Sequence, residues 1–330
     1  MDGEKLLFIS VKFLFFCGDK FSTPQLSNTM RFRLLFLFVL LMVIGLQACN
    51  KNNDSLITFH TPFGEMKAIL YDQTPGHKAN FLKLAASGAY DSTTWHRVIN
   101  DFMVQGGDLA EVGMPGKANK TIPAEFRQEL FHQKGAIAAA RKGDNVNPKK
   151  ASSACQFYIV DGKRVSKTEL VANMNAVNHY LTKYMPEVPG YDSVLYKLND
   201  IYHQDGLEAY NDEIFKLIPV MEDRFDVKLT KAGYPEARVK AYETIGGVYH
   251  LDDEYTVFGQ IVEGLDVIDQ LAAVETGAGD KPRKPVYIKI TVEEMSKKKL
   301  SKTFGLQYTE EGTVNVPLEV IKADYSKAKK

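Results

Sequence analysis

The residues with the clearest chemical potential lie between Trp95 and Asp108, where a cation, an aromatic ring, a thioether and an amide follow one another closely. They are Arg97, Phe102, Met103 and Gln105. A mostly apolar wall with a few polar groups is typical of a concave ligand site. The same stretch also fits an ordinary amphipathic hairpin with an exposed arginine. This segment alone therefore leaves both interpretations open.

The first half of the segment alternates like a β-strand. Alternation predicts that Arg97 shares one face with Trp95 and Ile99. It predicts that His96 and Val98 lie on the other face, so His96 is expected to be a buried structural histidine rather than a catalytic one. The two glycines near the end of the segment allow a tight turn or a close approach of the backbone.

Two later parts of the chain complete an ordered pattern. Gly135 to Arg141 is followed, after a polar loop, by Cys155 to Val160, and His250 to Gly259 comes much later. With the first segment, these resemble in order and spacing the signature segments of the cyclophilin family of peptidyl-prolyl cis/trans isomerases. The first segment carries the family's F-H-R-x-x-x-x-F-M-x-Q-G-G-D pattern, with Trp95 in place of the leading Phe. The resemblance covers about half of the chain, in two blocks.

The resemblance implies a fold and a reaction. The fold is mostly β, a closed antiparallel barrel of about eight strands capped by two helices. The reaction is rotation about an X-Pro peptide bond, whose barrier is about 18–20 kcal/mol. No covalent bond breaks, so no cofactor is expected. When the amide twists, the prolyl nitrogen regains a lone pair, and a guanidinium aimed at it stabilises only the twisted state.

The resemblance also implies a role for each matching residue. Arg97 is the catalytic guanidinium, Gln105 binds the substrate backbone and can hold Arg97, and Phe102 is grouped with them as part of the apolar proline pocket. The residues implied in substrate binding are Met103, Ala140, Arg141, Gln156, Tyr158, His250, Leu251 and Tyr255.

Four of these residues depart from the family's common pattern. Tyr158 stands where Phe is common, His250 where many members have Trp, Tyr255 where many have His, and Arg141 where Asn is common. Activity is expected to survive, because Arg97 and Gln105 are both retained. His250 and Tyr255 could equally be rim residues without a ligand contact.

Met30 begins a pattern that is typical of export. Arg31 and Arg33 form a positive region, residues 34–46 an apolar one, and Leu-Gln-Ala then precedes Cys49. This resembles a bacterial lipoprotein signal. An uncleaved membrane anchor and a plain secretory signal remain alternatives.

The lipoprotein interpretation predicts the organisation of the N-terminus. Residues 1–29 are expected to be a non-native extension, 30–48 the signal peptide, Cys49 the lipidated residue and 49–55 a tether. The protein is then expected in the bacterial cell envelope, anchored by lipid and facing the periplasm.

The remainder divides into three parts. Residues 56–160 and 245–295 are expected to form the barrel. Residues 161–244 carry apolar side chains at helical spacing, which predicts an α-helical insertion. The 296–330 extension is expected to add edge strands at 306–308 and 313–318, and to lack regular structure from 322 onward.

Charge and cysteine content narrow the possible partners. Lys plus Arg and Asp plus Glu number 41 each, and no nucleic-acid-binding motif is present, so no nucleic-acid partner is expected. The three cysteines are widely spaced and predict no metal site. Expected partners are proline-containing peptides, unfolded exported proteins, the membrane through the lipid, and proteins that contact the insertion. A non-enzymatic peptide-binding chaperone or scaffold is the alternative function.

Overall fold

The structure, a computed structural model, describes residues 52–231 and 233–328. The predicted extension 1–29, signal 30–48 and lipidated Cys49 lie outside these residues. None of the helices in the described ranges combines the length and apolar character that a bilayer crossing requires.

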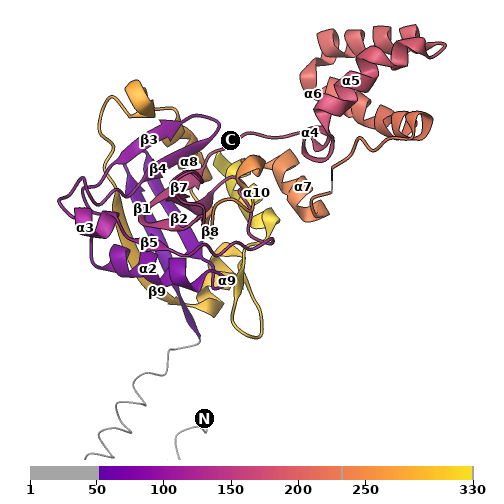
Figure 1. The fold of residues 1–330 in the computed structure, drawn as a ribbon. Helices are drawn as coiled ribbons and strands as arrows, with labels where there is room; N and C mark the ends of the chain where they lie inside the picture. Colours follow the sequence, from indigo (N-terminus) through magenta and orange to yellow (C-terminus); the bar gives the residue numbers. More distant parts are fainter. Residues whose placement is uncertain (1–51, 232, 329–330) are drawn as a thin grey trace, which may run out of the picture. The chain divides into compact units, whose positions relative to one another are not determined.

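A curled antiparallel sheet forms the centre of the fold (Figure 1). Eight strands follow the order β3-β4-β7-β6-β8-β2-β1-β9, and the short β5 pairs with β7. Their bounds are β1 Asn53–Thr61, β2 Gly64–Leu70, β3 Trp95–Ile99, β4 Met103–Gly106, β5 Thr121–Ile122, β6 Ala136–Arg141, β7 Ser152–Val160, β8 Val257–Glu263 and β9 Lys289–Ser296.

The closed barrel predicted from the sequence is not confirmed, and the sheet is an open half-barrel. Its outer strands, β3 and β9, approach each other at an isolated bridge between Thr94 and Tyr287. The strand β9 begins at Lys289. The residues just before β9 pair with the start of β3 instead, because the Trp95 N–H donates to the Val286 carbonyl at 2.9 Å and the Ile288 N–H donates to the Thr93 carbonyl at 2.8 Å.

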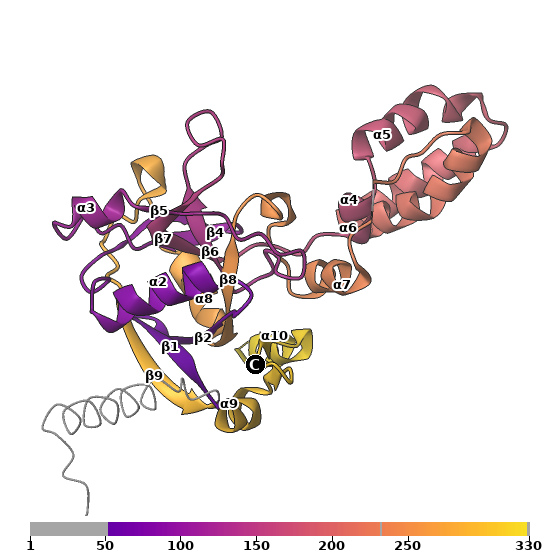
Figure 2. The same ribbon diagram turned by 60° about the horizontal axis from the view of Figure 1, so that its bottom comes forward.

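Two helices pack against different parts of the sheet (Figures 1 and 2). The first, α2 (Pro75–Ala86), contacts β7, β8 and β9, and it begins at a proline that suits the first helical turn. The second, α8 (Leu265–Ala272), contacts β2, β3 and β4. A single short turn of helix, α3 (Pro115–Ala118), lies in the loop before β5.

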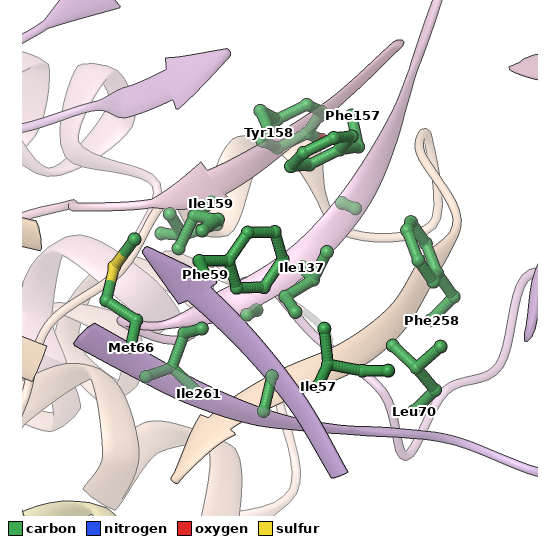
Figure 3. Close-up of a cluster of buried hydrophobic side chains, with 14 of the residues drawn as sticks. Ile57, Phe59, Met66, Leu70, Ile137, Phe157, Tyr158, Ile159, Phe258 and Ile261 are labelled. Atoms are coloured by element: carbon green, nitrogen blue, oxygen red, sulfur yellow. The ribbon is translucent and has the colours of Figure 1, made fainter. Parts of the chain in front are cut away.

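Aromatic and branched side chains fill the core between the strands (Figure 3). The Phe157 ring is its centre, with ring centroids 5.7 Å from Phe59, 5.3 Å from Phe81 and 5.6 Å from Trp95. These four side chains are almost fully buried. Aromatic pairs at such separations stabilise a core beyond the area that they bury. The strand β7 is therefore held firmly on its inner side.

Between β7 and β8 the chain is helical. It forms α4 (Lys167–Val171), α5 (Met174–Lys183), η1 (Met185–Glu187), α6 (Tyr191–Phe225), α7 (Glu236–Thr244) and η2 (Tyr249–Leu251). The helices α5, η1 and α6 share an apolar core of their own that includes Val177, Leu181 and Ile218. Gly206, with φ 85°, breaks α6 into two helices. Because helices make up so much of the described chain, the mostly-β class expected from the sequence is not confirmed.

The C-terminal extension differs from its prediction. It forms α9 (Lys297–Phe304), β10 (Gln307–Tyr308), β11 (Val314–Asn315) and α10 (Leu318–Ala328). The two strands pair with each other and are not edge strands of the main sheet. The prediction of no regular structure after residue 321 was wrong. Ile321 is fully buried, and the Asp324 carboxylate accepts the Leu265 N–H at 2.9 Å at the start of α8, so α10 is anchored despite its lysines.

The helical segment leaves and rejoins the sheet region at neighbouring points. Gly247 forms isolated bridges with both Gln133 and Lys163, and its N–H donates to the Lys163 carbonyl at 3.0 Å. Gly162 lies so close that a Cβ on it would overlap the Gly247 backbone. Gly247 has φ 154°, a conformation that side chains disfavour, and a Cβ there would overlap the His132 carbonyl oxygen.

We therefore expect Gly247→Ala to lower the free energy of unfolding by about 2–4 kcal/mol, from backbone strain and overlap at the crossing. Urea denaturation measures the change. Gly233→Ala is the matched control, since a Cβ at Gly233 meets no atom within 4 Å and its φ is ordinary. Its effect should stay within about 0.5 kcal/mol. Equal stability of the two variants would contradict the close crossing.

Candidate functional site

Ten of the eleven residues predicted for catalysis and substrate binding line one cavity of about 660 Å³. They are Arg97, Phe102, Met103, Gln105, Ala140, Arg141, Gln156, Tyr158, Leu251 and Tyr255. His250 is the exception. It is exposed and does not line the cavity, but its ring stacks on Phe102 with centroids 5.9 Å apart. The fold thus gathers segments that are separated by up to about half of the chain.

Strand register brings three of these residues into one row. Arg97 on β3 lies opposite Gln105 on β4, and Gln105 lies opposite Tyr158 on β7. Directly paired residues point to the same side of a sheet, and neighbouring strands lie about 4.8 Å apart. A cation, an amide and an aromatic ring are therefore held side by side by backbone hydrogen bonds rather than by flexible loops.

A bulge in β3 corrects the predicted strand faces. Trp95 pairs with Gly106 and Arg97 with Gln105, so His96 is the extra residue between two consecutive partners. Trp95 points into the core and is buried, whereas Arg97 reaches the cavity. The sequence predicted both on one face, because simple alternation does not foresee an inserted residue. Without the bulge, Arg97 would follow Trp95 into the core.

His96 is half-buried and contacts the polar side of the cavity. Its Nε2 lies 3.3 Å from the Gln105 amide nitrogen, which also donates to the Gln156 side-chain oxygen at 3.1 Å. An amide nitrogen only donates, so His96 accepts and is neutral in this contact. Burial agrees with this, because it lowers the pKa of His96. The sequence predicted a buried structural histidine, and His96 is half-buried and part of a His96–Gln105–Gln156 chain.

Arg97 pairs with a residue that the sequence did not indicate. Its Nε lies 3.3 Å from a carboxylate oxygen of Asp280, in the short turn η3 (Ala278–Asp280), and the two side chains are 44% and 47% exposed. The resemblance implied that Gln105 can hold Arg97, and only the Gln105 amide oxygen could accept from a guanidinium, because the amide nitrogen binds Gln156. Nothing in the Gly-rich turn around Asp280 predicts a contact with a strand 183 positions earlier.

Arg141 braces the rim of the cavity with its side chain. Its guanidinium lies 4.5 Å from the Tyr255 ring centroid, and its Nε donates to the Glu254 carbonyl at 2.8 Å. Its terminal nitrogens bind the carboxylates of Glu254 and Asp144. The side chain joins the loop after β6 to the segment after η2, which keeps this side of the cavity in shape.

The hydroxyl of Tyr158 has a buried partner. It lies 2.9 Å from Nε2 of His132, whose Nδ1 lies 3.0 Å from the carboxylate of Asp252. With Nδ1–H donating to the carboxylate, Nε2 accepts the Tyr158 hydroxyl proton. Burial lowers the pKa of His132 and raises that of Tyr158, so both groups are held neutral.

Comparison with known proteins identifies the family. The description "Cyclophilin type peptidyl-prolyl cis-trans isomerase/CLD" matches residues 56–182 and 229–293, more than half of the chain. A Staphylococcus saprophyticus protein named "Putative peptidyl-prolyl cis-trans isomerase" is 32% identical over 239 residues, which cover 72% of this chain and 90% of that protein. The chain belongs to the cyclophilin family.

Two further proteins complete the comparison. A bifunctional phosphatase/peptidyl-prolyl isomerase, also named as putative, of Streptococcus pyogenes is 31% identical over 70% of this cyclophilin, which spans only 37% of that longer protein. A cyclophilin type isomerase of Cryptosporidium parvum, known by crystal structure, is similar at 19% identity with a TM-score of 0.43, covering 73% of this chain and 98% of its own.

Membership of the cyclophilin family establishes the class of activity, and the family match does not cover the whole chain. This cyclophilin is a peptidyl-prolyl cis-trans isomerase, and substrates of the family are proline-containing peptides. Residues 183–228, which hold η1 and all of α6, fall between the two matched blocks. Within the described residues, no cluster of three or more His, Cys, Asp or Glu side chains could hold a metal ion.

The buried His132 gives a pH prediction. Its pKa is lowered by burial, so the folded protein binds a proton there less readily than the unfolded chain. The stability contribution of neutral His132 is present above the unfolded value of about 6.5 and is lost as pH falls below it. We expect NMR titration of the His132 ring nitrogens to give a midpoint below 6.5 in the folded protein. The ordinary midpoint should return in urea, and an unchanged midpoint in the folded state would contradict the arrangement.

Proposed function

We propose that this cyclophilin isomerises X-Pro bonds by the action of Arg97 on the twisted prolyl amide. The observation that supports it is the aligned row of Arg97, Gln105 and Tyr158 along one cavity. Tyr158, Phe102, Met103 and Leu251 form the apolar wall that receives the proline ring. Arg97 aims at the prolyl nitrogen, and the Gln105 side-chain oxygen accepts a hydrogen bond from the substrate backbone.

The magnitudes require more than one hydrogen bond. A rate gain of about 10⁵ corresponds to roughly 7 kcal/mol, at about 1.36 kcal/mol per tenfold. A hydrogen bond from a charged group contributes about 1.5–3 kcal/mol. The remainder comes from holding the amide in a poorly hydrated pocket whose polar groups are already oriented. The His96–Gln105–Gln156 chain and the braced rim supply that orientation.

We further propose that the substrates are exported proteins and that the enzyme works in the bacterial cell envelope. The support is the sequence alone, with a signal-like segment over 30–48 and a cysteine at position 49 that would carry the lipid. A lipid on Cys49 would hold the catalytic domain at the membrane surface, facing the periplasm, where extended chains emerge before they fold.

Arg97→Ala should lower kcat/KM on a short Ala-Pro peptide by about 10- to 150-fold, the loss of one charged hydrogen bond in the twisted state. Arg97→Lys should recover only part, because an ammonium lacks the planar fork. The control is Arg283→Ala, since Arg283 is exposed, pairs with Glu275 and does not line the cavity. Proline isomerisation followed by coupled proteolysis or by NMR exchange measures all three.

The rival function is a non-enzymatic binding module. An apolar groove of about 570 Å³ on the helical insertion, with Leu195, Leu198 and Tyr202 in its lining, is the observation in its favour. A folded parent that binds the peptide but does not turn it over, with Arg97→Ala unchanged, would favour this rival. Leu195→Asp then tests the groove, because a client-binding role predicts loss of protection against aggregation of an unfolded protein.

Asp280 should assist by orienting Arg97. It contacts Nε, on the stem side of the guanidinium, and so leaves the terminal nitrogens directed to substrate. Such exposed pairs contribute about 0.2–1 kcal/mol, so Asp280→Gly should lower kcat/KM by up to about fivefold. Glycine accepts the φ of 61° at this position.

Asp280→Asn keeps an acceptor and should lose less than the glycine variant. Glu275→Gly serves as a control for the loop, since Glu275 pairs with Arg283 rather than with Arg97. Higher activity in Asp280→Gly than in the parent would mean that Asp280 competes with substrate for Arg97, which is the opposite of the expected role.

A further inference from the structure

A buried carboxylate joins the helical insertion to the wall of the cavity. Asp252 follows Leu251 directly, and its side chain is only 3% exposed. One oxygen accepts both the backbone N–H of His132 at 2.8 Å and its ring Nδ1–H at 3.0 Å. The other accepts the Tyr242 hydroxyl at 2.7 Å and an Arg238 nitrogen at 3.3 Å. Four donors therefore converge on one anion.

The donors come from two different parts of the protein. Tyr242 and Arg238 belong to α7, the last helix of the insertion, and both are buried. The Tyr242 ring packs 5.6 Å from Phe131, and the Arg238 guanidinium lies 5.1 Å above the same ring. Phe131 immediately precedes His132. The helix α7 thus fixes both the carboxylate and the segment that carries the histidine.

The other side of the connection reaches the cavity. His132, 1% exposed, uses its second nitrogen to hold the Tyr158 hydroxyl, and the two rings are nearly parallel with centroids 6.0 Å apart. The Tyr158 ring meets Tyr255 edge-on at 6.0 Å. Tyr158, Tyr255 and Leu251 all line the cavity. The chain Tyr242–Asp252–His132–Tyr158 therefore runs without a break from α7 to the apolar wall.

We propose that Asp252 is a positioning residue through which α7 of the insertion sets the orientation of Tyr158 and so the affinity for the proline side of the substrate. This inference rests on the proposed function of the cavity. If the α7 donors are lost, the buried carboxylate turns to its remaining partner. His132 then shifts and releases the Tyr158 hydroxyl toward the apolar pocket, where an unpaired polar group opposes the binding of a proline ring.

The test removes single hydroxyls and measures their coupling. Tyr242→Phe deletes the donor to Asp252 but keeps the ring that packs on Phe131, and Tyr158→Phe cuts the chain at its other end. Tyr249→Phe is the matched control. Its hydroxyl also joins the sheet region to the insertion, at 3.3 Å from Glu169, but does not touch Asp252.

The measurements are the Kd of a short Ala-Pro peptide by calorimetry, and kcat and KM, on the purified full-length protein. Tyr242→Phe should raise Kd and KM about three- to tenfold, with little change in kcat. Tyr249→Phe should leave Kd at the parent value. In the Tyr158→Phe background, Tyr242→Phe should no longer change Kd, because the hydroxyl that transmits the effect is absent.

Two results would overturn the inference. The first is an equal effect of Tyr242→Phe with and without the Tyr158 hydroxyl, which would mean that Asp252 only anchors α7. The second is a parent-like Kd in Tyr242→Phe and in Arg238→Lys, a second variant that weakens the same oxygen's partners. The peptide Kd can be measured without turnover. A parent protein that binds the peptide but does not isomerise it would therefore refute the proposed function, while the Kd values of the variants would still test this inference.

Discussion

The pairing of β4 with its two neighbours is the constraint on which the cavity depends. β4 is four residues long, yet its register with β3 and β7 decides that Arg97, Gln105 and Tyr158 stand in one row. A slip of one residue in either pairing would exchange inward and outward side chains. The bulge at His96 belongs to the same constraint, because it turns Arg97 outward while Trp95 remains packed on Phe157. The rigid aromatic core and the row of Arg97, Gln105 and Tyr158 thus lie on two faces of one sheet in a single register.

The second constraint is the narrow crossing at which the helical segment begins and ends. Gly247 forms β-bridges with Gln133 and Lys163, so the two ends of this segment are paired backbone to backbone. A long helical segment whose ends lie side by side places no demand on the strands that it connects, which explains how β7 and β8 keep their places in the sheet. Only glycine permits the approach, at Gly162 and Gly247.

The sequence predicted which residues line the cavity better than it predicted how they are arranged. Motif order and spacing were enough to predict which residues would meet, because the same ordered segments lie side by side in the fold that they resemble. Ten of these residues line one cavity. Their roles stay predictions. Alternation failed at His96, where one inserted residue reversed the faces. Asp280 could not be predicted at all, since a contact between a glycine-rich turn and a distant strand leaves no local pattern. The helix α10 was not predicted, because its lysines suggested an unstructured end although Leu318, Ile321 and Tyr325 recur at helical spacing.

A buried carboxylate with donors from two sources makes those sources depend on each other. An uncompensated charge in the interior costs several kcal/mol, so removing either set of donors from Asp252 costs more than the hydrogen bonds themselves. His132 and the helix α7 therefore stabilise the same anion. If either one moves, the other must supply more of the hydrogen bonding to the Asp252 carboxylate. A hydrophobic contact between α7 and the segment that carries His132 would bind them equally well but would not fix an angle. The hydrogen bonds to Asp252 are directional and do fix an angle. This angle sets the orientation of the Tyr158 ring, which lies opposite Gln105 in the sheet.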